Sequence, residues 1–133
     1  MDPVVHFEMP YQDKARMASF YTNAFGWKAN MLGAEMGEYV MMHTTETDSH
    51  NMVQTPGHIN GGFFKKSRDS QNTSVVIAVK DIQASMKKIE ELGGKIIGAQ
   101  KPGEPDDIPG IGLYITIEDS EGNKVGMLQP KGM

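Results

Sequence analysis

The chain of 133 residues is long enough for one compact domain with a hydrophobic core. Its net charge is −4 and its basic residues are scattered, which argues against a nucleic-acid-binding protein, and no apolar run is long enough to span a membrane. The absence of cysteine excludes disulfides, thiolate catalysis and cysteine-ligated metals. Without a leader pattern at its start, the chain is expected to be cytoplasmic.

The first half of the chain has the pattern strand, helix and three strands. Residues 4–9 alternate as a strand does, and Pro10 is expected to end it. Asp13 has the side chain of a helix N-cap and Gly26 is a typical C-cap. Between them lies a helical stripe of apolar side chains, expected to be buried: Met17, Phe20, Tyr21, Ala24 and Phe25. A strand begins at Trp27, and further strands are predicted over 37–45 and 58–66, on either side of a polar loop.

The second half repeats this pattern. Asp81 and Gly94 stand 68 residues after Asp13 and Gly26, and each pair brackets a helical pattern that follows an apolar strand. Strands are predicted over 73–80, 95–99, 113–118 and 124–129, with a surface loop or lid over 101–110 and a tight turn at DSEGN. The inner face of the second helix is predicted to carry Ile82, Met86, Ile89 and Leu92. The chain is therefore predicted to be a duplication of a β-α-β-β-β unit.

The paired units, the helical segment FYTNAFGWK and the closing hairpin DSEGNKVGML resemble the vicinal oxygen chelate superfamily. That superfamily includes glyoxalase I, extradiol dioxygenases and bleomycin-resistance proteins. The resemblance implies an α+β fold in which two tandem β-α-β-β-β units form a cupped, half-open barrel sheet with the helices outside. A single glyoxalase-like domain would span residues 1–133, with units at about 3–68 and 72–131. The resemblance also implies a homodimer.

Members of this superfamily usually hold a divalent ion inside the barrel with His, Gln or Glu side chains at four inward positions. The resemblance places these positions at His6, Gly61 or Gly62, Ser74 and Gly126. Glycine has no side-chain donor, and a serine hydroxyl is a poor primary ligand for Zn, Ni, Mn or Fe(II). Only one position carries a ligand-type side chain, so we expect no bound metal and no other cofactor.

His6 and Glu8 share one face of the first strand and are the candidate catalytic residues, because a carboxylate beside an imidazole can act as a general base. An alternative is a facial triad of His6 and Glu8 with His43 or His58. The candidate ligand-binding residues are the side chains predicted to line the barrel: Tyr39, His43, His58, Asn60, Ser74 and Tyr114.

Two functions follow from these residues. The first is the binding of a small organic molecule in the barrel cavity without the usual metal. The alternative is a lyase or isomerase of the glyoxalase type, in which His6 and Glu8 act as acid and base or belong to a divalent metal site.

Overall fold

The computed structural model describes residues 1–132, an α+β chain that divides into two compact units. The first unit is His6–Thr73, and the second unit combines Met1–Val5 with the chain from Ser74 onward. The sequence predicted that the first unit begins near residue 3. Instead, the opening residues belong to the second unit, where the carbonyl of Pro3 accepts a hydrogen bond from the N–H of Ala78 at 2.9 Å.

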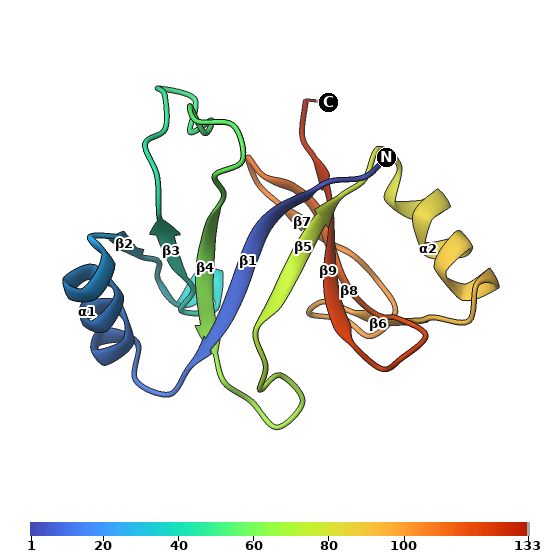
Figure 1. Ribbon diagram of the computed structural model, residues 1–133. Helices are drawn as coiled ribbons and strands as arrows, with labels where there is room; N and C mark the ends of the chain where they lie inside the picture. Colours follow the sequence, from blue (N-terminus) through green and yellow to red (C-terminus); the bar gives the residue numbers. More distant parts are fainter. Residues whose placement is uncertain (133) are drawn as a thin grey trace. The chain divides into compact units, whose positions relative to one another are not determined.

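The first unit has the predicted β-α-β-β-β order (Figure 1). Its sheet has the strand order β2-β3-β4-β1, in which β1 and β4 are parallel and the other pairs are antiparallel. Its elements are β1 (Val4–Tyr11), which starts in the second unit, α1 (Lys14–Phe25), β2 (Lys28–Met31), the short 3₁₀ helix η1 (Ala34–Met36), β3 (Val40–His43) and β4 (Asn60–Lys65).

Strand β1 continues through Pro10, where the sequence predicted its end. The carbonyl of Tyr11 accepts from the N–H of Lys66 at 2.8 Å, so Tyr11 directs its backbone groups toward β4. Because the backbone N–H and C=O groups of successive strand residues point to opposite sides, the backbone groups of Pro10 point away from β4. The N–H that proline lacks would therefore not have formed a hydrogen bond to β4. The proline is tolerated within the strand for this reason.

Helix α1 begins and ends at the predicted caps. The Asp13 carboxylate accepts from the N–H of Arg16 at 3.0 Å, and Gly26 adopts a left-handed conformation. The predicted buried stripe is wrong in part, because Phe20 and Phe25 are 60% and 62% exposed and Ala18 is buried instead. Ala18 is the buried residue of α1, and the core of this unit takes few of the helix's side chains. That core contains Tyr11, Val40, Met42 and Phe63, with Phe7, Met9, Met17, Tyr21 and Trp27 packed against it.

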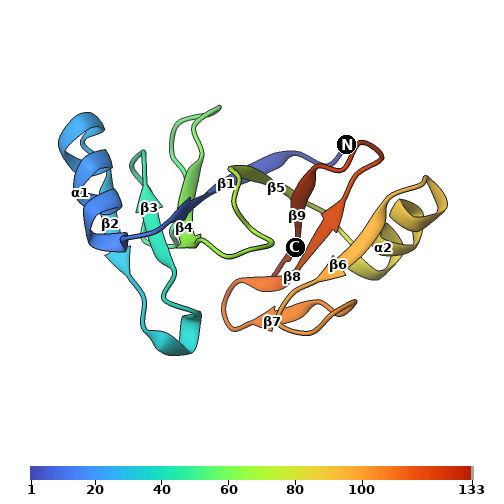
Figure 2. The same cartoon turned by 90° about the horizontal axis from the view of Figure 1, so that it is seen from below.

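The second unit repeats the order of the first and adds one short strand. Its sheet has the order β5-β9-β8-β6, and β7 pairs with β8 (Figure 2). Strand β7 lies in the segment that the sequence predicted to be a loop or lid. The backbone of β7 pairs with β8, and the side chain of Asp107 is exposed. The acidic side chains of this segment therefore do not prevent strand pairing. The elements are β5 (Ser74–Ala78), α2 (Ile82–Glu91), β6 (Lys95–Gly98), β7 (Asp106–Ile108), β8 (Gly112–Glu118) and β9 (Lys124–Pro130).

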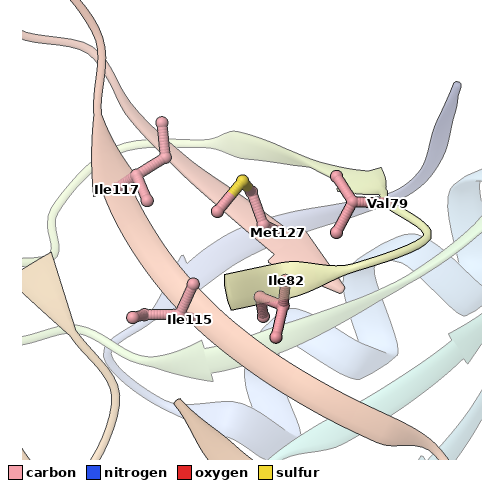
Figure 3. Close-up of a cluster of buried hydrophobic side chains, with 5 residues drawn as sticks. All are labelled: Val79, Ile82, Ile115, Ile117 and Met127. Carbon is pink, nitrogen blue, oxygen red and sulfur yellow. The ribbon is translucent and has the colours of Figure 1, made fainter. Parts of the chain in front are cut away.

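The core of the second unit lies between α2 and its sheet. Five buried side chains form its centre, namely Val79, Ile82, Ile115, Ile117 and Met127 (Figure 3). Met86 and Ile89 pack against them as the helical pattern predicted. Leu92 is 69% exposed, contrary to the prediction, because it is the C-cap residue at which the chain leaves the helix. No helix within residues 1–132 is long and apolar enough to cross a membrane.

Candidate functional site

The first unit presents two candidate site residues on the sheet face opposite α1. Phe7, Met9 and Tyr11 of β1 belong to the core beneath α1, so the alternate residues His6 and Glu8 project from the other face. We call this side the distal face; it carries His6, Glu8, Tyr39, Met41, Asn60, Gly62 and Phe64. The register pairs Glu8 of β1 and Met41 of β3 with Gly62 of β4, which lies between them.

His6 and Tyr39 form a hydrogen-bonded pair on the distal face. His6 Nε2 lies 2.8 Å from Tyr39 Oη, and the two rings are nearly parallel at an interplanar angle of 19°. Burial lowers the pKa of His6 below its ordinary value, and the negative charge of Glu8 opposes this effect. The imidazole is therefore neutral at pH 7, with one N–H donor and one acceptor nitrogen.

Gly62 leaves the space that the Tyr39 ring occupies. A Cβ atom added at Gly62 would lie only 2.0 Å from Tyr39 Oη and 2.1 Å from Cζ. Any side chain at this position would therefore displace the phenol and break its contact with His6. On the opposite face, a Cβ atom at Gly61 would lie 2.4 Å from the ring of Phe7. The glycine pair permits a close approach of a side chain from β1 on one face and of a side chain from the segment before β3 on the other.

The second unit contains the same arrangement of tyrosine over glycine. A Cβ atom at Gly126 of β9 would lie 2.8 Å from Oη of Tyr114, which belongs to the neighbouring strand β8. The positions 68 residues after His6 and Glu8 are Ser74 and Val76, and Val76 pairs with Gly126. The second unit therefore keeps the phenol above its glycine and has no imidazole or carboxylate at the matching positions.

The residues present do not fit the superfamily's metal ion. Of the four expected ligand positions, one is Gly61 or Gly62 and another is Gly126. An aromatic ring fills the space beside each of these glycines, namely Phe7 at Gly61, Tyr39 at Gly62 and Tyr114 at Gly126. Within residues 1–132, no three His, Asp or Glu side chains are grouped closely enough to hold an ion. The alternative triad of His6 and Glu8 with His43 or His58 is thus not assembled in the described part of the chain.

The remaining predicted residues of the first unit gather at the end of β3. The Asn60 side chain accepts hydrogen bonds from the backbone N–H groups of Thr44 and Thr45, at 2.8 and 3.3 Å. His58 Nδ1 lies 3.0 Å from the Thr45 hydroxyl, and His43 is the last residue of β3. Asn60 therefore holds the start of the loop that follows β3. The structure brings His6, Glu8 and Tyr39 together, and it places Ser74 and Tyr114 in the second unit.

The sequence reasoning missed two apolar residues of the distal face, Met41 and Phe64. Met41 pairs with Gly62 directly, and Phe64 lies two residues farther along β4. Strand alternation from Tyr39 and from Gly62 was the signal that could have identified them.

Comparison with known proteins supports the predicted resemblance. The model of the bleomycin resistance protein-like N-terminal family matches residues 4–45. A search of curated protein sequences gave no match. A methylmalonyl-CoA epimerase in complex with methylmalonyl-CoA and NH4+ superposes with a TM-score of 0.69 at 12% identity, covering 99% of this chain and 96% of that one.

Two further solved structures show the same likeness. A hypothetical protein from Bacillus halodurans gives a TM-score of 0.67 at 12% identity, covering 99% of this chain and 96% of that chain. The methylmalonyl-CoA epimerase of Mycobacterium tuberculosis gives 0.62 at 11% identity, covering 96% and 87% respectively. At such low identity these structures show a shared fold, which is the α+β glyoxalase-like fold. The family match in the first unit and the shared fold both support the resemblance to the vicinal oxygen chelate superfamily.

Proposed function

We propose that this protein binds a small organic molecule on the distal face of the first unit, without the divalent ion that is usual in the superfamily. The observation that carries this proposal is the hydrogen bond between His6 and Tyr39, which lies directly above Gly62. The superfamily resemblance assigns this face to the barrel interior. Binding sites commonly combine apolar surface with a few polar groups that fix the orientation of the ligand.

The distal face of the first unit has this composition. His6, Glu8 and Tyr39 are the polar groups, and Met41 and Phe64 are partly buried apolar neighbours. A neutral imidazole and a phenol can donate or accept hydrogen bonds, whereas Glu8 when ionised can only accept. These groups can orient an uncharged polar ligand with no ion between protein and ligand.

The test begins with the metal content of the purified protein, measured by mass spectrometry before and after treatment with EDTA. A library of small organic molecules is then screened by thermal shift, and hits are titrated calorimetrically. We expect binding to be unchanged by EDTA and weakened by His6→Ala, while His50→Ala, which changes an exposed loop histidine, serves as the control. Stoichiometric, tightly held Zn, Ni, Mn or Fe, or equal binding by the His6→Ala variant, would contradict the proposal.

The second candidate function is an isomerase or lyase in which His6 and Glu8 act as acid and base. It is favoured by the placement of an imidazole and a carboxylate on one strand face, close enough for the charge of Glu8 to act on His6. Because methylmalonyl-CoA epimerases share the fold, methylmalonyl-CoA is the first substrate to test, with epimerisation followed by circular dichroism. Turnover that is lost in Glu8→Gln would establish this function, and absence of turnover would exclude this substrate.

A homodimer and a cytoplasmic location complete the proposal. Both come from the sequence and the superfamily resemblance. Light scattering coupled to size-exclusion chromatography tests the first: a mass near twice the 14.6 kDa of one chain is expected, and a monomer at all concentrations would contradict it. Fractionation of the source cells tests the second.

A further inference from the structure

An open cavity of about 380 Å³ lies beside the first turn of α1 in the first unit. Strands β1 and β4 end side by side here, with Tyr11 paired with Lys65, and the chain after β1 turns into α1 (Figure 1). The volume falls within the range of about 300–1,000 Å³ that is typical of small-molecule sites. None of the residues of the distal face lines this cavity, so it is a separate feature of the first unit.

Two cationic side chains from different elements line the cavity. Arg16 lies in the first turn of α1, and Lys66 follows β4, where its backbone N–H donates to the carbonyl of Tyr11 at 2.8 Å. In the described part of the chain, neither the guanidinium of Arg16 nor the ammonium of Lys66 has an ion pair or a side-chain hydrogen bond. Lys14 in the same helical turn, by contrast, is paired with Glu38. Two charges at the cavity are therefore available to an anion.

Apolar side chains of α1 form another part of the lining. Met17 and Phe20 line the cavity together with Arg16. The Phe20 ring is 60% exposed, and it packs edge-on against Tyr21 with ring centroids 5.2 Å apart and an interplanar angle of 79°. This packing restricts the orientation of the exposed ring. An aromatic or hydrocarbon group placed against Met17 and Phe20 would remove apolar surface from water.

We propose that this cavity binds a small monocarboxylate with an aromatic or hydrocarbon body. Arg16 and Lys66 contact the carboxylate, because a guanidinium and an ammonium both form charge-assisted hydrogen bonds with carboxylate oxygens. The body of the ligand lies against Met17 and Phe20. This is a second binding site of the first unit, on the α1 side of its sheet, and it does not depend on the distal face.

The charge of the lining matches a monoanion. Its charged side chains are Arg16 and Lys66, with two positive charges, and Asp13, with one negative charge, so the lining has a net charge of +1 in a chain whose net charge is −4. One oxygen of Asp13 accepts from the backbone N–H of Arg16 at 3.0 Å, so this carboxylate already serves as the helix cap. A phosphate dianion would exceed the charge of the lining. The cavity therefore favours a carboxylate over a phosphate.

The test compares phenylacetate with phenylacetamide, an uncharged compound of nearly the same shape. Each is titrated into the full chain with isotope-labelled methionine methyl groups, and the Met17 methyl resonance, assigned with a Met17→Leu variant, is followed by NMR. Phenylacetate should shift this resonance in a saturable manner and should bind more tightly than the amide. Arg16→Gln and Lys66→Gln should each weaken phenylacetate binding about three-fold and together about ten-fold, as expected for exposed charge contacts. Lys87→Gln is the matched control, because Lys87 is an exposed cation of α2 that does not line the cavity.

Four results would overturn the proposed site or its ligand class. Equal binding of phenylacetamide would show that the charge of the ligand is not recognised. Equal weakening by Lys87→Gln would show that the net charge of the chain attracts the anion, and not this cavity. Tighter binding of inorganic phosphate in competition with phenylacetate would contradict the assignment to a monocarboxylate. If the ring resonances of His6 move and the Met17 methyl resonance does not, the carboxylate binds on the distal face and the site at α1 is wrong. Near-ultraviolet circular dichroism confirms that each variant is folded.

Discussion

The packing of Tyr39 on Gly62 predicts a strong energetic coupling between the two residues. The perturbation is Gly62→Ala, made in the wild-type chain and in a Tyr39→Ala background. In the wild-type chain the new methyl group would stand 2.0 Å from Tyr39 Oη, so the ring must leave its position and its hydrogen bond with His6 is lost. In the Tyr39→Ala background the three atoms nearest to the new methyl group, all of which belong to the Tyr39 side chain, are absent.

The magnitude follows from three terms. Forcing a side chain out of a packed position costs about 1–3 kcal/mol, and the lost hydrogen bond adds about 1 kcal/mol. The change from glycine to alanine within a strand returns about 0.5–1 kcal/mol of backbone conformational entropy. Gly62→Ala should therefore destabilise the wild-type chain by about 1–3 kcal/mol and stabilise the Tyr39→Ala chain by about 0.5 kcal/mol.

Urea denaturation of the four chains, followed by circular dichroism, measures this coupling as a double-mutant cycle. The NMR resonances of the His6 ring provide an independent readout, and they should shift in the Gly62→Ala single variant. An equal effect of Gly62→Ala in both backgrounds would refute the reasoning, because the methyl group would then not meet Tyr39. A loss of stability in the Tyr39→Ala background would point to a different contact at Gly62.

The remaining predictions concern protonation and the second core. Because the pKa of His6 is lowered on folding, the unfolded chain takes up this proton first as the pH falls, so stability should decrease below about pH 6.5. Urea titrations from pH 7.5 to 5 should show this loss, and it should be smaller in His6→Gln; an equal loss in both chains would contradict the assignment. Ile115→Ala should cost about 2–5 kcal/mol, because the side chain is fully buried. Ile111→Ala, at a position 42% exposed, is its control and should cost much less; similar thermal denaturation midpoints would exclude the assigned core.

Features encoded by neighbouring residues were predictable from the sequence. Asp13 and Asp81 cap their helices as expected, since an N-cap needs only its own side chain and the next backbone turn. The placement of His6 and Glu8 on one strand face follows from alternation, and the structure has both on the distal face. The duplicated order of elements follows from the same local signals repeated along the chain.

Features that depend on distant residues were not predictable in this way. The contact between Tyr39 and Gly62 depends on the register of β3 against β4, which the alternation within either strand does not specify. The tolerance of Pro10 depends on which side of β1 faces β4. The exposure of Phe20 and Phe25 depends on how much of α1 the sheet covers. Each of these is a property of pairing between segments.

The two tyrosine–glycine contacts also explain why a metal site would be hard to restore in this chain. A ligand side chain at Gly62 would displace Tyr39, and one at Gly126 would displace Tyr114, so each position needs two simultaneous changes. A single substitution at either glycine would lose packing before it gained an ion, and one new ligand beside His6 would still bind an ion weakly. The units differ instead at His6 and Glu8, where a side chain can change without displacing a tyrosine. Only the first unit therefore has an imidazole and a carboxylate at these positions, while both units keep a tyrosine packed against a glycine.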